Sequence, residues 1–105
     1  MRRRRAAAAS GPVRVQVAPN GGLVARVGFV VPRTVGGAVV RNRLRRRLRA
    51  LMEGRLEANA GLDVVVGASA GAVDVPWSSL EGALDACLAG ARARLRGGWR
   101  RRVCP

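Results

Sequence analysis

The segment from residue 39 to residue 49 constrains the fold more than any other part of this 105-residue chain. Six of the nine residues from 41 to 49 are arginines. Between and after them, apolar residues recur at the spacing of one face of an amphipathic helix: Val40, Leu44, Leu48, Leu51, Met52 and Leu56. The segment must therefore form a surface helix that turns one apolar stripe to a core and a dense positive charge to its surroundings.

The arginines of this segment indicate a polyanionic partner. Pairs four residues apart, such as Arg41 and Arg45, repel by about 0.2 to 0.5 kcal/mol each. Each guanidinium presents a fixed fork of donors that matches two phosphate oxygens. A solvated charged face, which is what most charge runs form, is the alternative. We favour the polyanion, because no acidic residue occurs between Ala25 and Met52 to neutralise the run.

The composition supports nucleic acid as that partner and excludes several other functions. All 20 basic residues are arginines against six acids, so the net charge is +14 and the isoelectric point is near 12. With no histidine, we predict no catalytic residue and no metal site in the protein. The two cysteines, Cys87 and Cys104, indicate free thiols and no disulfide-linked partner. No stretch resembles a signal peptide or a membrane span, so we expect a cytoplasmic protein with no membrane partner.

The remaining periodicities predict a small α+β domain. Residues 13–17 alternate as a half-buried strand does, and residues 19–22 form a turn into a partner strand at 23–31, as in a hairpin. The apolar run at 62–66 predicts a central strand covered on both faces, and Pro76 suits the first turn of a second helix. The order of elements predicts a two-layer α/β sandwich, with a mixed sheet of about four strands and the helices on one face.

The predicted RNA-binding domain spans residues 10–96. Residues 1–9 form a basic remnant and residues 97–105 a basic tail, and both are expected to be disordered. Trp77 falls on the apolar stripe of the second helix, where we expect it to anchor the core, with base stacking as the alternative. Trp99 lies in the tail, where stacking on exposed RNA bases is a candidate role.

A longer pattern surrounds the arginine segment. Residues 28–40, Gly-Phe-Val-Val-Pro-Arg-Thr-Val-Gly-Gly-Ala-Val-Val, lead directly into Arg41-Asn42-Arg43 and the basic helix. This order of a strand, a short basic loop, a Gly-x-Ala-Val turn and an Arg-Asn-Arg helix resembles the signature of the protein subunit of bacterial ribonuclease P. The similarity continues through residues 61–66 and 77–80, and it covers roughly residues 10–95.

The resemblance implies both an architecture and a function. It implies a left-handed crossover around the arginine helix, which the general rule disfavours. The implied function is to assist endonucleolytic removal of the 5′ leader from precursor tRNA, as the accessory subunit of an enzyme whose RNA subunit hydrolyses the phosphodiester. Mg²⁺, held mainly by that RNA, is the implied cofactor, and ribonuclease P RNA and precursor tRNA are the implied partners.

The resemblance also implies which residues bind RNA. By their positions in the motif, the ribonuclease P RNA would be contacted by Arg33, Arg41, Asn42, Arg43, Arg45, Arg46, Arg47 and Arg49. Asn42 could hold an arginine fork or bond a sugar or base edge, and capping the start of the helix is an equally weighted alternative.

The implied contact with the single-stranded leader departs from the family pattern. The family binds the leader beside an N-terminal helix that carries phenylalanine, whereas residues 1–9 contain no aromatic residue and most of that helix is expected to be missing. Either the sequence starts at an internal site of the family pattern, or the leader contact is rebuilt with arginine. Leader binding should therefore be weak, since stacking on an aromatic side chain contributes about 1 to 3 kcal/mol per base. Candidate replacement contacts on the strands are Arg14, Gln16, Arg26 and Phe29.

Two other functions are compatible with the charge. A structural RNA-binding protein of the ribosomal type has the same small size and basic tail. A duplex-DNA binder could insert the arginine helix into a major groove. The ordered spacing from Gly28 to Arg43 argues against the first, and the lack of a helix-turn-helix pattern argues against the second.

Overall fold

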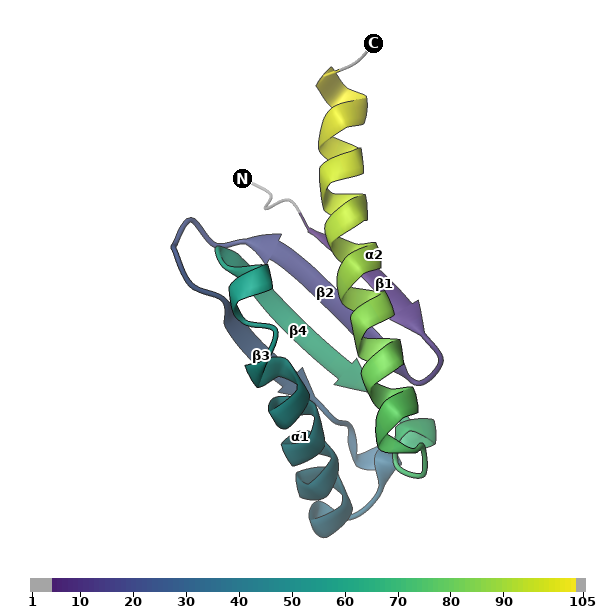
Figure 1. Ribbon diagram of the computed structural model, residues 1–105. Helices are drawn as coiled ribbons and strands as arrows, with labels where there is room; N and C mark the ends of the chain where they lie inside the picture. Colours follow the sequence, from purple (N-terminus) through teal and green to yellow (C-terminus); the bar gives the residue numbers. More distant parts are fainter. Residues whose placement is uncertain (1–4, 104–105) are drawn as a thin grey trace.

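A computed structural model describes residues 5–103, with side chains described for residues 5–96. Within these residues lie strands β1 (Ala6–Ser10), β2 (Val13–Pro19), β3 (Arg26–Val30) and β4 (Leu62–Ala68), and helices α1 (Ala38–Glu53) and α2 (Trp77–Val103). Short 3-10 turns connect them at Arg33–Val35, Glu57–Asn59 and Ala70–Ala72. The strands form one sheet in the order β1-β2-β4-β3, with both helices on one face (Figure 1). The α+β sandwich with a mixed sheet of four strands is confirmed.

β4 lies inside the sheet, as predicted, but it separates the two strands that were expected to form a hairpin. It pairs antiparallel with β2 and parallel with β3, so residues 20–25 cross over the end of β4. The tight hairpin instead joins β1 to β2 across Gly11, whose φ of +57° suits glycine. The hairpin prediction is wrong because the turn residues show only that the chain reverses direction after β2. They do not show that β4, which comes later in the chain, lies between β2 and β3.

β3, α1 and β4 form a crossover between adjacent parallel strands. Seen from the helix side with both strands pointing upward, β4 lies to the left of β3, so the crossover is left-handed (Figure 1). Connections of this kind are right-handed in nearly all proteins. The chain enters α1 through Gly36, where a Cβ would lie 3.0 Å from Cγ1 of Val40. Only glycine fits this close approach without displacing the first turn of α1.

The core lies between the sheet and the two helices. Alternate residues of β2 and β4 point into it, and each helix adds its apolar stripe, as predicted. The buried side chains of these elements are Val13, Val15, Val17, Leu44, Leu48, Leu51, Met52, Val64, Val66, Leu80, Leu84, Leu88 and Ala91. Leu56, which was expected to continue the stripe, lies beyond the end of α1 and is exposed. No helix among the described residues is both long and apolar enough to cross a bilayer.

Both ends of the described chain differ from the expected disorder. Ala6–Ser10 pair with β2 as strand β1. α2 packs close to β1 because the facing residues are small: a Cβ added to Gly90 would lie only 3.2 Å from Cβ of Ala8. α2 continues to Val103, since each residue added to an existing helix gains a hydrogen bond and arginine favours helix. Residues 1–4 and 104–105, and the side chain of Trp99, lie outside the described part of the chain.

Candidate nucleic-acid interface

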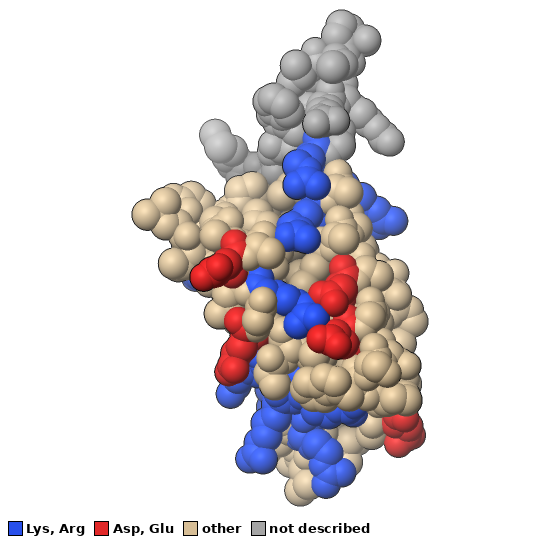
Figure 2. All heavy atoms as spheres, in the orientation of Figure 1, with Lys and Arg blue, Asp and Glu red and all other residues tan. Residues whose placement is uncertain are grey.

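α1 presents a basic surface because its apolar stripe sets its rotation. Leu44 and Leu48 are buried against the sheet, so the opposite side of the helix faces outward. We call the exposed polar side chains on this side the arginine face: Asn42, Arg43, Arg46 and Arg49. Figure 2 shows basic side chains gathered over α1 at the lower end of the molecule. A shallow depression of about 280 Å³ lies among Val39, Asn42, Arg43 and Arg46.

Other arginines of α1 are partly occupied by the protein itself. Arg45 donates a hydrogen bond from Nη1 to Oδ1 of Asn42 at 3.0 Å, so Asn42 holds an arginine as one of its expected roles. The alternative role as a helix cap is wrong, because α1 begins at Ala38 and its N-cap is Gly37.

Arg41, in the first turn of α1, differs from these arginines, because its Nε is buried without a hydrogen-bond partner.

Arg47 points toward the start of α2. Its Nη2 donates to the carbonyl oxygen of Val75 at 2.9 Å, and its Nη1 donates to that of Val73 at 3.5 Å. Its guanidinium carbon lies over the ring of Trp77, 5.8 Å from the ring centroid, which is within the range of a cation–π interaction. Arg47 therefore ties α1 to the segment that leads into α2, in addition to any contact with RNA.

The expectation that Trp77 anchors the core is wrong. Its side chain is 46% exposed, because Trp77 is the first residue of α2 and lies where the helix has not yet reached the sheet. Leu80, one turn later, is the first fully buried residue of the helix. Helical spacing placed both residues on one stripe but could not show where along that stripe the core ends.

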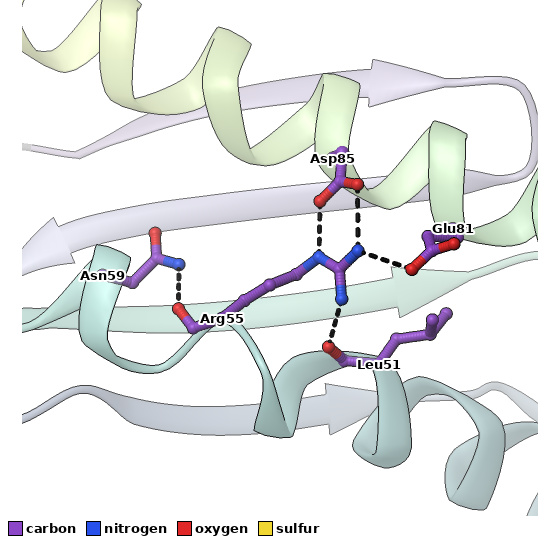
Figure 3. Close-up of polar contacts among 5 residues, drawn as sticks. All are labelled: Leu51, Arg55, Asn59, Glu81 and Asp85. Atoms are coloured by element: carbon purple, nitrogen blue, oxygen red, sulfur yellow. Dashed lines mark hydrogen bonds and ion pairs between the residues drawn. The ribbon is translucent and has the colours of Figure 1, made fainter.

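Arg55, which follows α1, joins it to α2 through two carboxylates (Figure 3). Its Nη2 donates to Oδ2 of Asp85 and to Oε2 of Glu81, each at 2.9 Å, and its Nε bonds Oδ1 of Asp85. The hydrogen bond with Asp85, and then that with Glu81, raises the pKa of Arg55. The same bond from Arg55 holds the pKa of Asp85 below its usual value. Sequence reasoning missed this cluster, whose only local signal is the pair of acids one turn apart on α2.

The sheet face away from the helices forms an open groove of about 550 Å³. The predicted leader contacts Arg14 and Gln16 line it, together with small residues of β1 and with Val65, which is 39% exposed. β4 is therefore covered on one face only, and the expectation of cover on both faces is wrong. A strand of alternating burial reaches solvent on its second face unless another layer packs there.

The other two candidate leader contacts do not line this groove. Arg26 is exposed on β3 and forms an ion pair with Asp63, with Nε and Oδ1 3.6 Å apart. Side chains alternate between the two faces of β3, and Phe29, like Val27, is on the face that packs against the core. Phe29 therefore points away from this groove, and its role as a leader contact stays a prediction. Arg33, from the basic loop before α1, is exposed within its 3-10 turn.

Comparisons with known proteins agree on one family. The family model described as Ribonuclease P matches residues 1–92. The chain is 51% identical over 74 residues to the ribonuclease P protein component of Streptomyces bikiniensis, covering 70% of this chain and 57% of that protein. It is 46% identical over 85 residues to that of Salinispora tropica, covering 80% of this chain and 62% of the relative. The chain thus spans less than two thirds of the length of these curated relatives.

Solved structures share the fold. The RNase P protein from Thermotoga maritima has a TM-score of 0.68 at 26% identity, covering 76% of this chain and 77% of that one. The RNase P protein from Staphylococcus aureus has a TM-score of 0.71 at 23% identity, covering 81% of this chain and 79% of that one. These likenesses support the four-strand sheet, the two helices and their arrangement.

Proposed function

Because the chain belongs to the ribonuclease P protein family, we propose that it is the accessory protein of a ribonuclease P holoenzyme, which removes the 5′ leader of precursor tRNA. The observation that carries the proposal is the arginine face of α1, which the buried Leu44 and Leu48 hold outward from the domain. This face is the surface through which the chain would bind the ribonuclease P RNA. The Gly-x-Ala-Val turn and the Arg-Asn-Arg motif, which give the family its signature, lie at its start.

The arginine face suits RNA phosphates. Arg43 and Arg46 are exposed and, in the described part of the chain, have no hydrogen bond or ion pair within the protein, so their guanidinium forks are available to phosphate oxygens. Arg41 precedes them on the same helix, and its half-buried side chain would add charge to this contact. Arg33, Arg45, Arg47 and Arg49 would add charge around this contact.

In the proposed holoenzyme, the family resemblance assigns the metal ion and the chemistry to the RNA subunit. The described residues include no group of three or more histidines, cysteines or acids placed to hold a metal ion. Mg²⁺, the cofactor that the family resemblance implies, would be held mainly by the RNA subunit and would supply the hydrolytic chemistry there. The protein would contribute positive charge that draws RNA strands together, and the phosphodiester hydrolysis would belong to the RNA.

The open groove is the proposed site for the single-stranded leader. Arg14 and Gln16 project into it from β2, where a guanidinium and an amide can bond phosphate and base edges. Among the residues that the structure describes, no aromatic side chain lines the groove, so stacking would add nothing to leader binding there. We expect this contact to be weaker than that of the arginine face.

Cleavage of a precursor tRNA by a bacterial ribonuclease P RNA at low Mg²⁺, with and without the protein, tests the proposal. The protein should stimulate cleavage at the mature 5′ end, and a variant with Arg43→Ala and Arg46→Ala should lose most of the stimulation. The matched control carries Arg94→Ala and Arg96→Ala, which remove the same amount of charge from α2. This control should keep most of the stimulation. Absence of stimulation, or equal binding to random duplex DNA and to the RNA, would count against the proposal.

A further inference from the structure

We propose that Trp77 is a stacking platform for an unpaired base of the RNA that α1 binds. This inference rests on the proposed function, because it adds a base contact beside the phosphate contacts of the arginine face. It assigns to Trp77 a ligand of defined chemistry, namely a nucleobase in a loop, bulge or single-stranded junction. Stacking on an aromatic side chain requires a base that has left its own helix.

The exposure of Trp77 is the first observation. Its side chain is 46% exposed, although tryptophan is large and the core of this domain begins only three residues later, at Leu80. The other aromatic side chain in the described range, that of Phe29, packs against the core. Trp77 therefore offers RNA the most accessible aromatic surface among the side chains that the structure describes.

The second observation is that Arg47 holds the ring in place. The guanidinium carbon of Arg47 lies over the ring, 5.8 Å from its centroid, and the same guanidinium donates to the carbonyl oxygens of Val73 and Val75. The arginine is thus positioned by the backbone just before Trp77. A ring with a fixed cation over it loses little conformational freedom when a base stacks on its open surface.

The third observation is the continuity of this ring with the arginine face. Arg43 lies one helical turn before Arg47 on α1, so the two backbone positions are roughly 6 Å apart along the helix. Arg43 is exposed and belongs to the face proposed to bind phosphate. An RNA strand with its phosphate on Arg43 can therefore place an adjacent base on Trp77. Because every base has a π face, this contact would tolerate different bases at that position.

The fluorescence of Trp77 provides a direct test in the whole 105-residue chain. The chain contains two tryptophans, so a Trp99→Phe variant leaves Trp77 as the only one. Titration of this variant with a bacterial ribonuclease P RNA should quench its fluorescence in step with binding. A fully paired RNA duplex should bind through charge with little quenching, because its bases are already stacked.

Affinity measurements separate stacking from charge. Trp77→Leu should weaken binding of the ribonuclease P RNA about 5- to 150-fold, and Trp77→Phe should restore part of the loss. The matched control is Leu23→Ala, which removes an exposed apolar side chain from the loop between β2 and β3 and should leave affinity unchanged. Trp77→Leu should unfold at the same midpoint as the parent protein. If Trp77→Leu is less stable than the parent, Trp77→Phe, which keeps an aromatic ring, provides the comparison of RNA affinity.

The outcomes distinguish this inference from the function on which it rests. If Trp77→Leu binds as tightly as the parent and RNA leaves the fluorescence unchanged, the stacking site is overturned while the arginine face stands. Equal quenching by the paired duplex would also overturn it. If the parent protein does not bind the ribonuclease P RNA at all, the proposed function fails and the stacking site fails with it.

Discussion

Arginines of one helix have different surroundings in this protein, although the sequence presents them as a single run. Arg43 and Arg46 face outward, Arg45 is held by Asn42, and Arg47 bonds the backbone before α2. These differences follow from the rotation of α1, which its buried leucines determine. Substitutions along the run should therefore separate into those that change RNA binding alone and those that also change stability.

Leu48 is the residue whose loss should most clearly damage the core beneath the arginine face. Its side chain is 0% exposed, so Leu48→Ala removes buried methyl groups and leaves a cavity, at a cost of about 2 to 5 kcal/mol in the free energy of unfolding. Urea denaturation followed by circular dichroism measures this change. Arg46→Ala, on the exposed side of the same helix, should change stability by less than about 0.5 kcal/mol. An unchanged midpoint for Leu48→Ala would place that side chain outside the core.

Asp85 should make stability depend on pH through its contact with Arg55. Asp85→Asn keeps the shape but removes the charge, and because the carboxylate is 54% exposed we expect a loss of about 1 kcal/mol near pH 7. Arg55 lowers the folded-state pKa of Asp85. The contribution is therefore complete above the unfolded-state pKa of about 3.9 and is lost as pH falls through the lower folded-state value.

Urea denaturation of the parent and of Asp85→Asn at several pH values tests this linkage. The difference between the two proteins should be largest near pH 7 and should shrink as the pH falls below about 4. A difference of the same size at pH 7 and at pH 3 would show that Asp85 acts through packing and not through its charge.

At the scale of elements, α2 is held against β1 by small residues. A Cβ added to Gly90 would lie 3.2 Å from Cβ of Ala8, whereas one added to Gly82 on the same helix would meet nothing within 4 Å. Gly90→Leu should therefore push α2 away from β1 and destabilise the fold by about 1 to 3 kcal/mol. Gly82→Leu is the matched control, and it should be neutral or stabilising because leucine favours helix over glycine.

Thermal or urea unfolding of the two glycine variants measures this contact between the elements. The opposite signs expected for the same substitution separate crowding from helix propensity. If Gly90→Leu were as stable as Gly82→Leu, the close approach of α2 to β1 would not be required for folding, and β1 would contribute little to the sheet.

At the scale of the whole molecule, the net charge of +14 governs how the protein meets RNA. Basic side chains lie over α1 at one end of the molecule and over α2 toward the other, and most of the acidic side chains visible in this view lie between them (Figure 2). If about six arginines neutralise phosphates of a single-strand-like RNA backbone, the logarithm of affinity should fall with the logarithm of salt concentration with a slope near −4. Binding should therefore weaken steeply between low and moderate salt.

Fluorescence anisotropy of labelled ribonuclease P RNA over a series of salt concentrations gives this slope. Removing Arg43 and Arg46 together should reduce its magnitude by about 1.4, because each lost phosphate contact removes roughly 0.7. Trp77→Leu should lower affinity without changing the slope, since stacking releases no counterions. A slope near zero for the parent would show that phosphate neutralisation does not drive binding.

The spacing of apolar residues was enough to predict the two helices and the burial of residues such as Leu44 and Leu48, and the order of a short motif was enough to indicate the family. These features depend on spacing within a few turns of one element, or on the order of a short motif, and both are local properties of the chain. The same spacing placed the arginines on the outside of α1. The two helices, strands β2, β3 and β4, and the proposed RNA-binding surface could therefore be predicted from the sequence, whereas β1 could not.

How distant segments of the chain meet could be seen only in the three-dimensional fold. The insertion of β4 between β2 and β3, the contact of Arg47 with Trp77, and the joining of the two helices by Arg55 all bring together residues far apart in the chain. Such contacts have no local signature, because they depend on which surfaces remain unpaired once the core has formed. For the same reason the sequence placed Trp77 in the core, whereas the position of α2 on the sheet leaves its ring exposed beside the arginine face.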